Sequence, residues 1–161
     1  MIIRKAKIKD LKSIIDLFIL FRKEDDKFLS GFLLYIARLN KNYKAELNKE
    51  LRKYIYAKNK AAYVAEDKNK VIGFVLGYIK DYPKFFKVNR EGYIDALFVA
   101  RKYRGKGISS MLKENIFKWF AEKKMKYAGL DTAQNNKHAQ KIYKKWGFNP
   151  LSIVMKAEIK K

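Results

Sequence analysis

A basic loop with two glycines, residues 101–109 with the sequence Arg-Lys-Tyr-Arg-Gly-Lys-Gly-Ile-Ser, has the residue types that bind a phosphate. Gly105 and Gly107 allow positive φ angles and a close approach of the backbone to a ligand. The loop follows an apolar run at 93–99, which predicts a buried strand, and precedes a periodic segment at 109–126, which predicts a helix. Because unpaired N–H groups and a positive dipole end lie at the start of a helix, this order predicts an anion site.

Two familiar phosphate motifs do not fit this loop. It lacks the Gly-Lys-Ser/Thr ending of the nucleotide P-loop and the three-glycine spacing of the dinucleotide fingerprint. It resembles instead the coenzyme A pyrophosphate loop of the GNAT acetyltransferase superfamily, Arg/Gln-x-x-Gly-x-Gly/Ala, at Arg104, Gly107 and Ser109. Ser109 stands where the family usually has Gly or Ala, and it is small enough for the loop to be kept.

A second motif strengthens this resemblance. Residues 136–148, with the sequence Asn-Lys-His-Ala-Gln-Lys-Ile-Tyr-Lys-Lys-Trp-Gly-Phe, are similar to the family's Asn-x-x-Ala-x-x-x-Tyr-x-x-x-Gly-Phe. The two motifs follow each other in the family's order, and the layout fits along nearly the whole chain. The match is weakest over residues 22–60, the region where the acceptor usually sits in the family.

The resemblance implies acetyl-CoA as co-substrate, no metal, and transfer of the acetyl group to a primary amine by direct attack on the thioester. It places the pyrophosphate on the glycine loop and the pantetheine arm in a gap between parallel strands at 97–99 and 129–131. The cofactor-binding residues that it implies are Leu97, Phe98, Val99, Arg104, Gly105, Lys106, Gly107, Ile108, Ser109, Asn136, Ala139 and Tyr143.

This reaction needs a neutral amine and a proton for the departing thiolate. A lysine-like amine is neutral in only about one molecule in 2,500 at pH 7, so its deprotonation costs roughly 4.6 kcal/mol, against roughly 1.4 kcal/mol for an α-amine. Asp95, at a position where the family often has an acid, is the candidate base, acting directly or through water. The alternative is that Asp95 is only a surface or ion-paired carboxylate, and Glu91 is then the second candidate for the base. Tyr143 is the candidate general acid, with a core tyrosine as the alternative. His138 is set aside because that motif position usually points outward.

Acidic residues lie where the family covers its acceptor pocket. Glu24, Asp25 and Asp26 stand between the first helix and an aromatic segment, and Asp131 is the last residue of the second strand of the gap. We expect these carboxylates to attract a cationic amine, either a polyamine-like small molecule or a peptide or protein amine; a solvated helix end is the alternative. The net charge of +22 opposes a polycation unless this acidic patch dominates locally.

Composition limits the function classes. The 161 residues predict a single domain over 1–161. The absence of cysteine excludes a thiol nucleophile, and the single histidine excludes a multi-histidine metal cluster.

No run has the length and hydrophobicity of a signal peptide or a membrane span, so we expect a cytoplasmic protein without membrane contact. Basic residues are spread from end to end, which disfavours nucleic acid as a partner without excluding it. The alternatives are a catalytically silent acyl-CoA sensor and a nucleic-acid-binding module; family precedent suggests a homodimer.

The remaining pattern predicts the elements that position these residues. Strands are expected at 2–6, 61–66, 71–80, 93–99, 126–131 and 151–159, and helices at 11–21, 45–56, 109–126 and 136–146. Residues 81–92 are expected to form a loop, Gly73 and Gly77 to mark a bulge or close approach, and Gly147 to end the last helix. The predicted fold class is α/β: a GNAT-like mixed, mostly antiparallel central sheet with a splayed parallel strand pair, flanked by helices on both faces.

Overall fold

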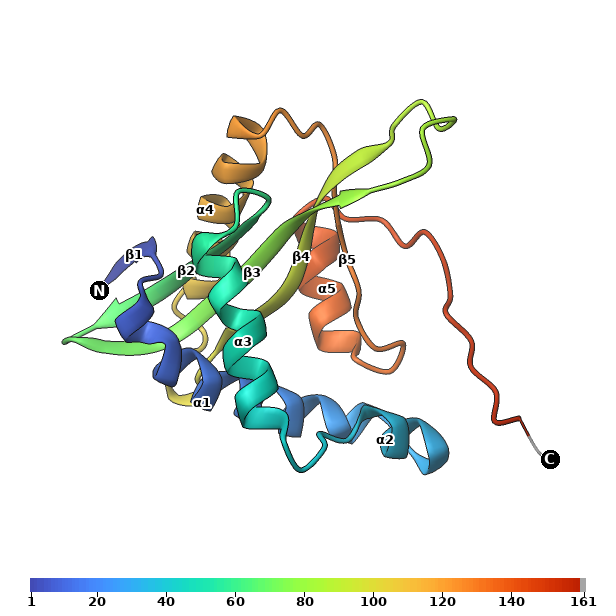
Figure 1. The fold of residues 1–161 in the computed structure, drawn as a ribbon, viewed down its shortest axis with the longest axis horizontal. Coiled ribbons are helices and arrows are strands. Elements are labelled where there is room, and N and C mark those ends of the chain that lie inside the picture. Colours follow the sequence, from blue (N-terminus) through green and yellow to red (C-terminus); the bar gives the residue numbers. More distant parts are fainter. Residues whose placement is uncertain (160–161) are drawn as a thin grey trace.

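A five-stranded sheet forms the centre of the computed structural model, which describes residues 1–159 (Figure 1). The strands lie side by side in chain order: β1 (Ile2–Lys5), β2 (Lys60–Asp67), β3 (Lys70–Asp81), β4 (Arg90–Val99) and β5 (Ala128–Leu130). Every neighbouring pair is antiparallel except β4 and β5, which are parallel. The predicted mixed, mostly antiparallel sheet is therefore confirmed.

Helices cover both faces of this sheet. They are α1 (Leu11–Asp25), α2 (Gly31–Ala37), α3 (Tyr43–Tyr56), α4 (Ile108–Glu122) and α5 (Lys137–Lys145). Short 3-10 turns occupy Ile8–Asp10, Asp26–Phe28 and Arg101–Tyr103. Core side chains of α1 and α3 pack on one face of the sheet, and those of α4 pack on the other. Within residues 1–159, no helix combines the length and hydrophobicity that crossing a bilayer requires.

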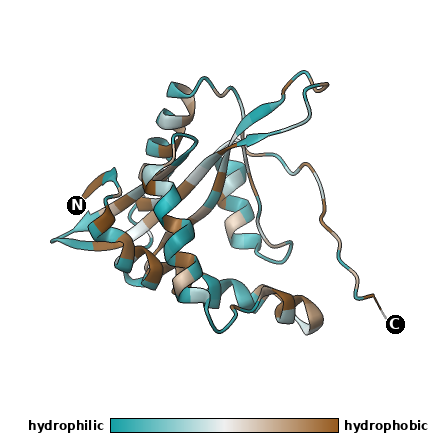
Figure 2. Cartoon of the chain, in the orientation of Figure 1, coloured by the Kyte–Doolittle hydropathy of each residue, from teal (hydrophilic) through white to brown (hydrophobic). Residues whose placement is uncertain are grey.

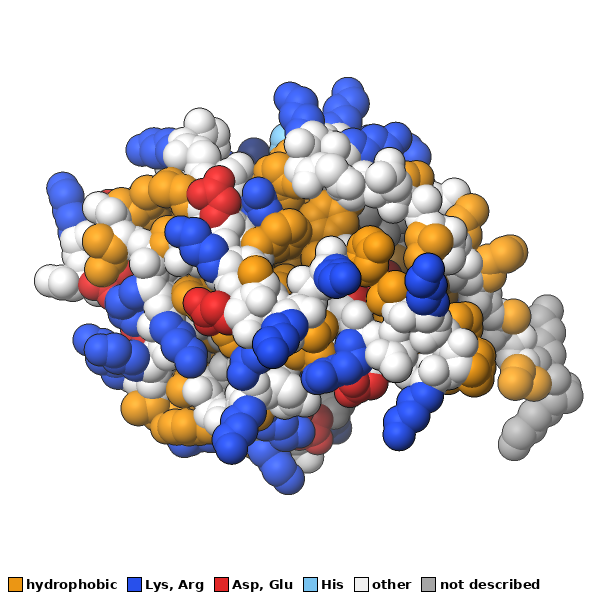
Figure 3. Space-filling model, turned by 90° about the horizontal axis from the view of Figure 1, so that it is seen from above, with side chains coloured by type: hydrophobic (Ala, Val, Ile, Leu, Met, Phe, Trp, Pro, Cys, Tyr) orange, Lys and Arg blue, Asp and Glu red, His pale blue; other side chains and the backbone are white. Residues whose placement is uncertain are grey.

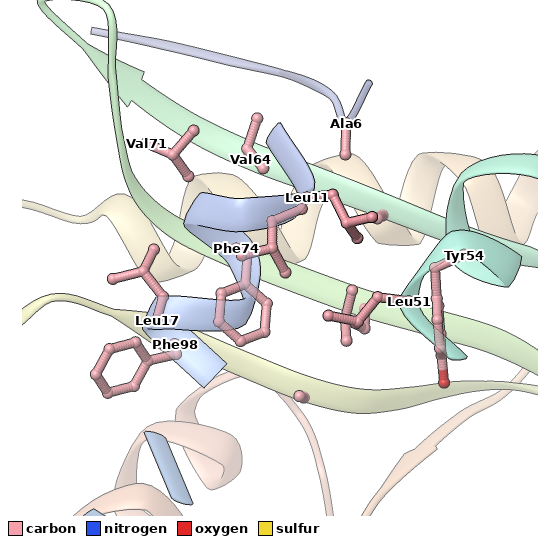
Figure 4. Close-up of a cluster of buried hydrophobic side chains, with 13 residues drawn as sticks. Ala6, Leu11, Leu17, Leu51, Tyr54, Val64, Val71, Phe74 and Phe98 are labelled. Atoms are coloured by element: carbon pink, nitrogen blue, oxygen red, sulfur yellow. The ribbon is translucent and has the colours of Figure 1, made fainter. Parts of the chain in front are cut away.

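The core has two halves because β3 is apolar on both of its faces. Phe74 and Leu76 point toward α1 and α3, where the cluster in Figure 4 is closed by Leu51 of α3. Val75 and Ile79 point the other way and pack on α4. The alternation of buried side chains thus fixes the register of β3 between its two helical layers.

The two predicted glycine irregularities in β3 are confirmed. A Cβ on Gly77 would lie 2.8 Å from the side chain of Ile116, so only glycine lets α4 approach this closely. At the same point the pairing of β3 with β4 shifts: Leu76 lies opposite Ala96, but Gly77 lies opposite Ile94. The residue between them in β4 is Asp95, which therefore occupies a β-bulge.

One predicted strand is absent, and several predicted boundaries are wrong. Residues 151–159 were predicted to be a strand, but they form none and are exposed. The predicted loop at 81–92 is shorter, since the hairpin pairing continues to Asp81 and Arg90, which also form an ion pair of 3.0 Å. Helix α4 begins at 108 and ends at 122, earlier than the predicted 126, because Lys124 adopts a left-handed φ of 62°.

Candidate active site

The parallel strands β4 and β5 separate soon after they pair. Pairing covers only 92–94 with 128–130, so the strands diverge beyond Ile94 and Leu130. A pocket of about 350 Å³ opens at this point, lined by residues of both strand ends, the glycine loop, α1 and α5. The predicted gap at 97–99 and 129–131 thus begins earlier on β4 than expected, and Gly129 lies inside the paired part.

The glycine loop forms one end of this pocket. Gly105 and Gly107 have φ angles of +77° and +74°, which side chains of L-residues rarely adopt. Gly107 precedes the first residue of α4, and no side chain caps the helix there. The first N–H groups of α4 are therefore free of side-chain acceptors, as an anion site requires. Ile108 and Ser109 also line the pocket, whereas Lys106 does not.

Arg104 connects the loop to its surroundings. Its Nε donates a 2.8 Å hydrogen bond to the carbonyl of Val99, and its Nη2 lies 2.9 Å from Glu24 Oε2. The guanidinium also lies over the ring of Phe98, 5.1 Å from the ring centre. The side chain thus fastens the loop to the end of β4 and to α1.

Asp95 is aimed by the bulge toward α3. The hydroxyl of Tyr54 donates a 2.6 Å hydrogen bond to Asp95 Oδ2. Burial first, and then the negative charge of Asp95, raise the pKa of Tyr54 far above its ordinary value, so the phenol stays protonated and donating. Sequence reasoning missed Tyr54: nothing local signals a partner 41 residues away.

Two tyrosines of the sheet lie next to each other outside the pocket lining. Tyr78 and Tyr93 are register partners on β3 and β4, and their ring centres lie 5.3 Å apart. Burial is the main cause that raises the pKa of each, and the neighbouring Asp131 carboxylate raises that of Tyr93 further. Glu91, the second candidate base, does not line the pocket and instead accepts a 2.6 Å hydrogen bond from the Tyr82 hydroxyl.

Helix α5 closes the pocket from the other side. The Asn136 side chain caps this helix, accepting a 3.1 Å hydrogen bond from the Ala139 N–H, and both residues line the pocket. Tyr143 lines it too, and burial raises the pKa of its phenol, with the nearby Asp25 carboxylate as the second cause. At the end of α5, Gly147 has a φ of +90°, which confirms the predicted helix stop.

The acidic residues do not all reach the pocket. Glu24 and Asp25 line it, as does Asp131, but Asp26 does not. Glu24 is neutralised by Arg104, whereas burial raises the pKa of Asp25 despite Arg22 at 3.5 Å. Their role in acceptor binding stays a prediction.

Comparison with known proteins shows which protein family has a sequence like the one that forms this pocket. The sequence model of the acetyltransferase (GNAT) family matches residues 18–148, which include the glycine loop and all of the residues that line the pocket. The chain belongs to the GNAT family. The predicted family and the predicted α/β fold class are therefore confirmed, and β4–β5 is the parallel pair that the fold prediction included.

Individual GNAT proteins resemble this chain over different lengths of sequence. An N-alpha-acetyltransferase MAK3 of Arabidopsis thaliana is 30% identical over 97 residues, 60% of this chain and 49% of that protein. A spermine/spermidine N(1)-acetyltransferase of Bacillus subtilis is 28% identical over 81 residues, 48% of this chain and 52% of that protein. The chain thus spans about half the length of these curated relatives. A predicted acetyltransferase from Clostridium acetobutylicum, solved with acetyl-CoA, has the same fold with a TM-score of 0.76 and 20% identity, over 98% of this chain and 95% of that one.

Within this GNAT pocket, the structure brings together most residues that the motifs predicted. All predicted cofactor-binding residues except Lys106 line it, and so do Asp95, Asp131, Glu24 and Asp25. His138, which the motif argument set aside, lines it as well. Pocket residues that sequence reasoning missed are Phe21, Lys27, Phe28, Ile94, Ala96, Leu130, Thr132, Ala133, Ile142 and Trp146.

Proposed function

We propose that this GNAT chain transfers the acetyl group of acetyl-CoA to a primary amine in the pocket between β4 and β5. One observation carries the proposal: a single pocket joins the uncapped start of α4 to the carboxylate of Asp95 across the gap between the strands. The first feature suits a diphosphate and the second suits an ammonium group. The names of the relatives, an N-alpha-acetyltransferase and a spermine/spermidine acetyltransferase, support an amine acceptor.

The chain's residues fit the co-substrate in their chemistry. The N–H groups of the loop over 104–109 would hold the pyrophosphate, with Lys106 adding charge at the mouth. Leu97 and Val99 would flank the pantetheine arm from β4, while Asn136 and Ala139 would bound it from α5. The solved Clostridium relative contains acetyl-CoA, which supports this assignment.

Asp95 is the proposed base. Its Oδ2 accepts the hydrogen bond of Tyr54, so Oδ1 is left to receive a proton from the acceptor, directly or through one water. The amine nitrogen then forms the new bond to the acetyl carbon as the carbon–sulfur bond breaks. Tyr143 is the proposed acid: its raised pKa keeps the phenol protonated, so that it can donate to the departing sulfur.

Local charge favours a cationic acceptor in spite of the net charge of the chain. Four carboxylates line the pocket, against Lys27 and Arg104 as the only Lys or Arg side chains among its lining residues. Since Arg104 is paired with Glu24 and Arg22 with Asp25, the carboxylates that remain for an acceptor are Asp95 and Asp131. A polyamine and a peptide α-amine both satisfy this arrangement, and the α-amine is cheaper to deprotonate.

Thiol release from acetyl-CoA tests the proposal with two acceptor panels, polyamines such as spermidine and peptides with a free amino terminus. We expect release with at least one panel and its near loss in Asp95→Asn, while calorimetry shows acetyl-CoA binding unchanged in that variant. Binding without release in either panel would support the silent acyl-CoA sensor. If the chain instead bound RNA or DNA with steep salt dependence and ignored acetyl-CoA, the nucleic-acid-binding module would be favoured.

A further inference from the structure

The hairpin between β3 and β4 ends in a loop that exposes apolar side chains. We call residues 83–88, with the sequence Pro-Lys-Phe-Phe-Lys-Val, the hairpin tip; they lie where the hairpin projects beyond the helices in Figure 1. Phe85 is 83% exposed, Phe86 is 52% exposed and Val88 is 42% exposed. In Figure 2 hydrophobic colour appears at this tip, beyond the hydrophilic ends of the two strands.

The hairpin tip is held in place by the strand ends beneath it. Strands β3 and β4 stay paired up to Asp81 and Arg90, whose side chains form an ion pair of 3.0 Å. One step further, the Tyr82 N–H donates a 2.8 Å hydrogen bond to the carbonyl of Asn89, and a backbone bond of 3.1 Å closes a turn inside the tip. The apolar groups are therefore presented in a fixed arrangement, which lowers the entropy cost of binding through them.

Basic side chains surround these apolar groups. Lys84 and Lys87 bracket the two phenylalanines, and both are exposed. Neither forms an ion pair with a carboxylate of residues 1–159. The one acidic residue between 80 and 90 is Asp81, which is already paired with Arg90. An apolar tip inside a basic collar complements a surface that is apolar within and anionic outside.

Nucleic acid, the other polyanion, fits the hairpin tip less well. Bases stack on free aromatic faces, whereas Phe85 and Phe86 lie against each other, with ring centres 4.7 Å apart and planes inclined by 39°. Val88 has no ring on which a base could stack. Single-stranded nucleic acid also follows a positively charged groove, while the hairpin tip is a projection (Figure 1). The mixture of aromatic and aliphatic side chains fits the boundary of a lipid layer better.

We propose that the hairpin tip docks this chain on an anionic lipid surface. Phe85, Phe86 and Val88 enter the boundary between headgroups and acyl chains, and Lys84 and Lys87 contact lipid phosphates. Binding of this kind scales with the apolar area that is buried plus the attraction to anionic lipid, and the attraction falls off within a Debye length.

This docking is peripheral and separate from the pocket. The prediction of no membrane contact depended on the lack of a spanning run, which a docked tip does not need. Residues 83–88 do not line the pocket between β4 and β5, so the docking is independent of acetyl transfer.

Vesicle sedimentation tests the apolar contribution, with vesicles of phosphatidylcholine alone and vesicles of phosphatidylcholine mixed equally with phosphatidylglycerol. The net charge of +22 by itself draws the chain toward anionic vesicles, so the variants are decisive. We expect Phe85→Ser/Phe86→Ser to bind the mixed vesicles about tenfold or more weakly. Tyr56→Ser removes a 66% exposed ring elsewhere and should bind nearly as the natural chain does. Equal binding of both variants, or no binding of the natural chain, would overturn the proposal.

Charge substitutions test the basic collar in the same assay. Lys84→Gln/Lys87→Gln removes two charges at the tip, and Lys12→Gln/Lys118→Gln removes two exposed charges from α1 and α4 as the matched control. We expect the tip variant to bind mixed vesicles several-fold more weakly than the control, and salt to reduce the difference by screening. Equal losses would show that net charge alone, without the tip, attracts the chain, and would overturn the docking.

A tryptophan at the tip separates lipid from nucleic acid. The emission of Phe85→Trp should shift to the blue on mixed vesicles and be quenched by brominated acyl chains, while that of Tyr56→Trp should change little. A single-stranded RNA oligonucleotide should leave the Phe85→Trp emission unchanged, because no base stacks there. Quenching by the RNA, or no response to the vesicles, would contradict lipid docking. Unchanged thermal unfolding of the exposed-site variants checks that each one is folded.

Discussion

Tyr54 and Asp95 form the best-defined pair in the pocket, joined by a hydrogen bond of 2.6 Å. In the proposed reaction this bond orients the carboxylate, so Tyr54 is a positioning residue. We expect Tyr54→Phe to lower kcat about tenfold with little change in the KM for acetyl-CoA, since a positioning loss acts on the reacting geometry. Steady-state kinetics measure this split. Tyr56→Phe, on the same helix but 66% exposed, is the control and should match the natural chain; equal kinetics for both variants would remove the proposed role of Tyr54.

Tyr143 gives a prediction about pH as well as rate. Tyr143→Phe should lower kcat by about 10²-fold or more while acetyl-CoA binding persists, because a general acid acts only on the chemical step. Burial is the main cause that raises the pKa of Tyr143, and the charge of Asp25, which disfavours the phenolate, is the second. Asp25→Asn should therefore lower that pKa and move the loss of kcat at high pH to a lower pH. A basic limb that stays in place in Asp25→Asn would show that Tyr143 is not the acid.

The motifs predicted most single residues of the site, but not the pairs they form. Arg104, Gly107, Asn136 and Tyr143 could be found because the family spaces them regularly along the chain. The hydrogen bond between Tyr54 and Asp95 joins a helix to a strand, and no spacing rule connects them. The ion pair that occupies Glu24 was likewise invisible in the sequence, where Glu24 looked available to a substrate.

At the scale of elements, the left-handed glycines before α4 shape the proposed phosphate site. Gly107 has a φ of +74°, and an added Cβ there would meet no atom within 4 Å, so Gly107→Ala introduces backbone strain without a clash. That strain is about 1–2 kcal/mol, and we expect acetyl-CoA affinity to fall about 5- to 30-fold by calorimetry. Gly147→Ala is the matched control, since its φ is +90° and its added Cβ is equally unobstructed. It should reduce thermal stability yet bind acetyl-CoA nearly as well; equal losses of affinity would argue against a special role for the loop.

The start of α1 is fastened to β1 by charge. Both Nη atoms of Arg4 bind Asp10, at 2.6 and 2.8 Å, Arg4 also contacts Glu66, and Asp10 accepts the Lys7 N–H at 2.8 Å. Asp10 is 4% exposed, and the Arg4 hydrogen bonds are the main cause that lowers its pKa. We expect Asp10→Asn to lower the free energy of unfolding by about 1–3 kcal/mol at neutral pH, allowing for the partial exposure of Arg4.

The pH dependence of that loss has a definite sign. A carboxyl with a lowered pKa stabilises the fold above its ordinary value of about 4, and this contribution disappears as pH falls through the lowered value. The gap between the natural chain and Asp10→Asn, measured by urea unfolding, should therefore shrink as pH falls below about 4. Exposed Asp16→Asn on the same helix is the control and should be nearly neutral. A gap that stays constant from neutral to acid pH would mean that the ion pair is not its origin.

Periodicity predicted the elements well where local pattern and tertiary partners agree. The two-sided apolar strand β3 and the amphipathic α4 were evident because each buries its apolar side against an adjacent element. The segment 151–159 has the same kind of pattern, but pattern alone does not supply the edge that a strand needs. The residues of the segment alternate as those of a strand do, but the segment has no pairing partner within the described part of its own chain.

At the scale of the whole molecule, the net charge and the pocket charge have opposite signs. Figure 3 shows Lys and Arg side chains scattered over the face in view and not gathered in one patch. The pocket, in contrast, contains more carboxylates than cationic side chains. Most of the positive charge therefore lies outside the pocket, on the solvated surface, where it attracts anions.

Product formation is the measurement that tests the central claim most directly. Acetyl-CoA and the best amine from the panels are incubated with the chain, and the acetylated amine is measured by mass spectrometry beside the free thiol. The account predicts equal amounts of both products, with turnover nearly lost in Asp95→Asn and Tyr143→Phe although both variants still bind acetyl-CoA. Thiol release without acetylated amine, or full turnover in both variants, would contradict it.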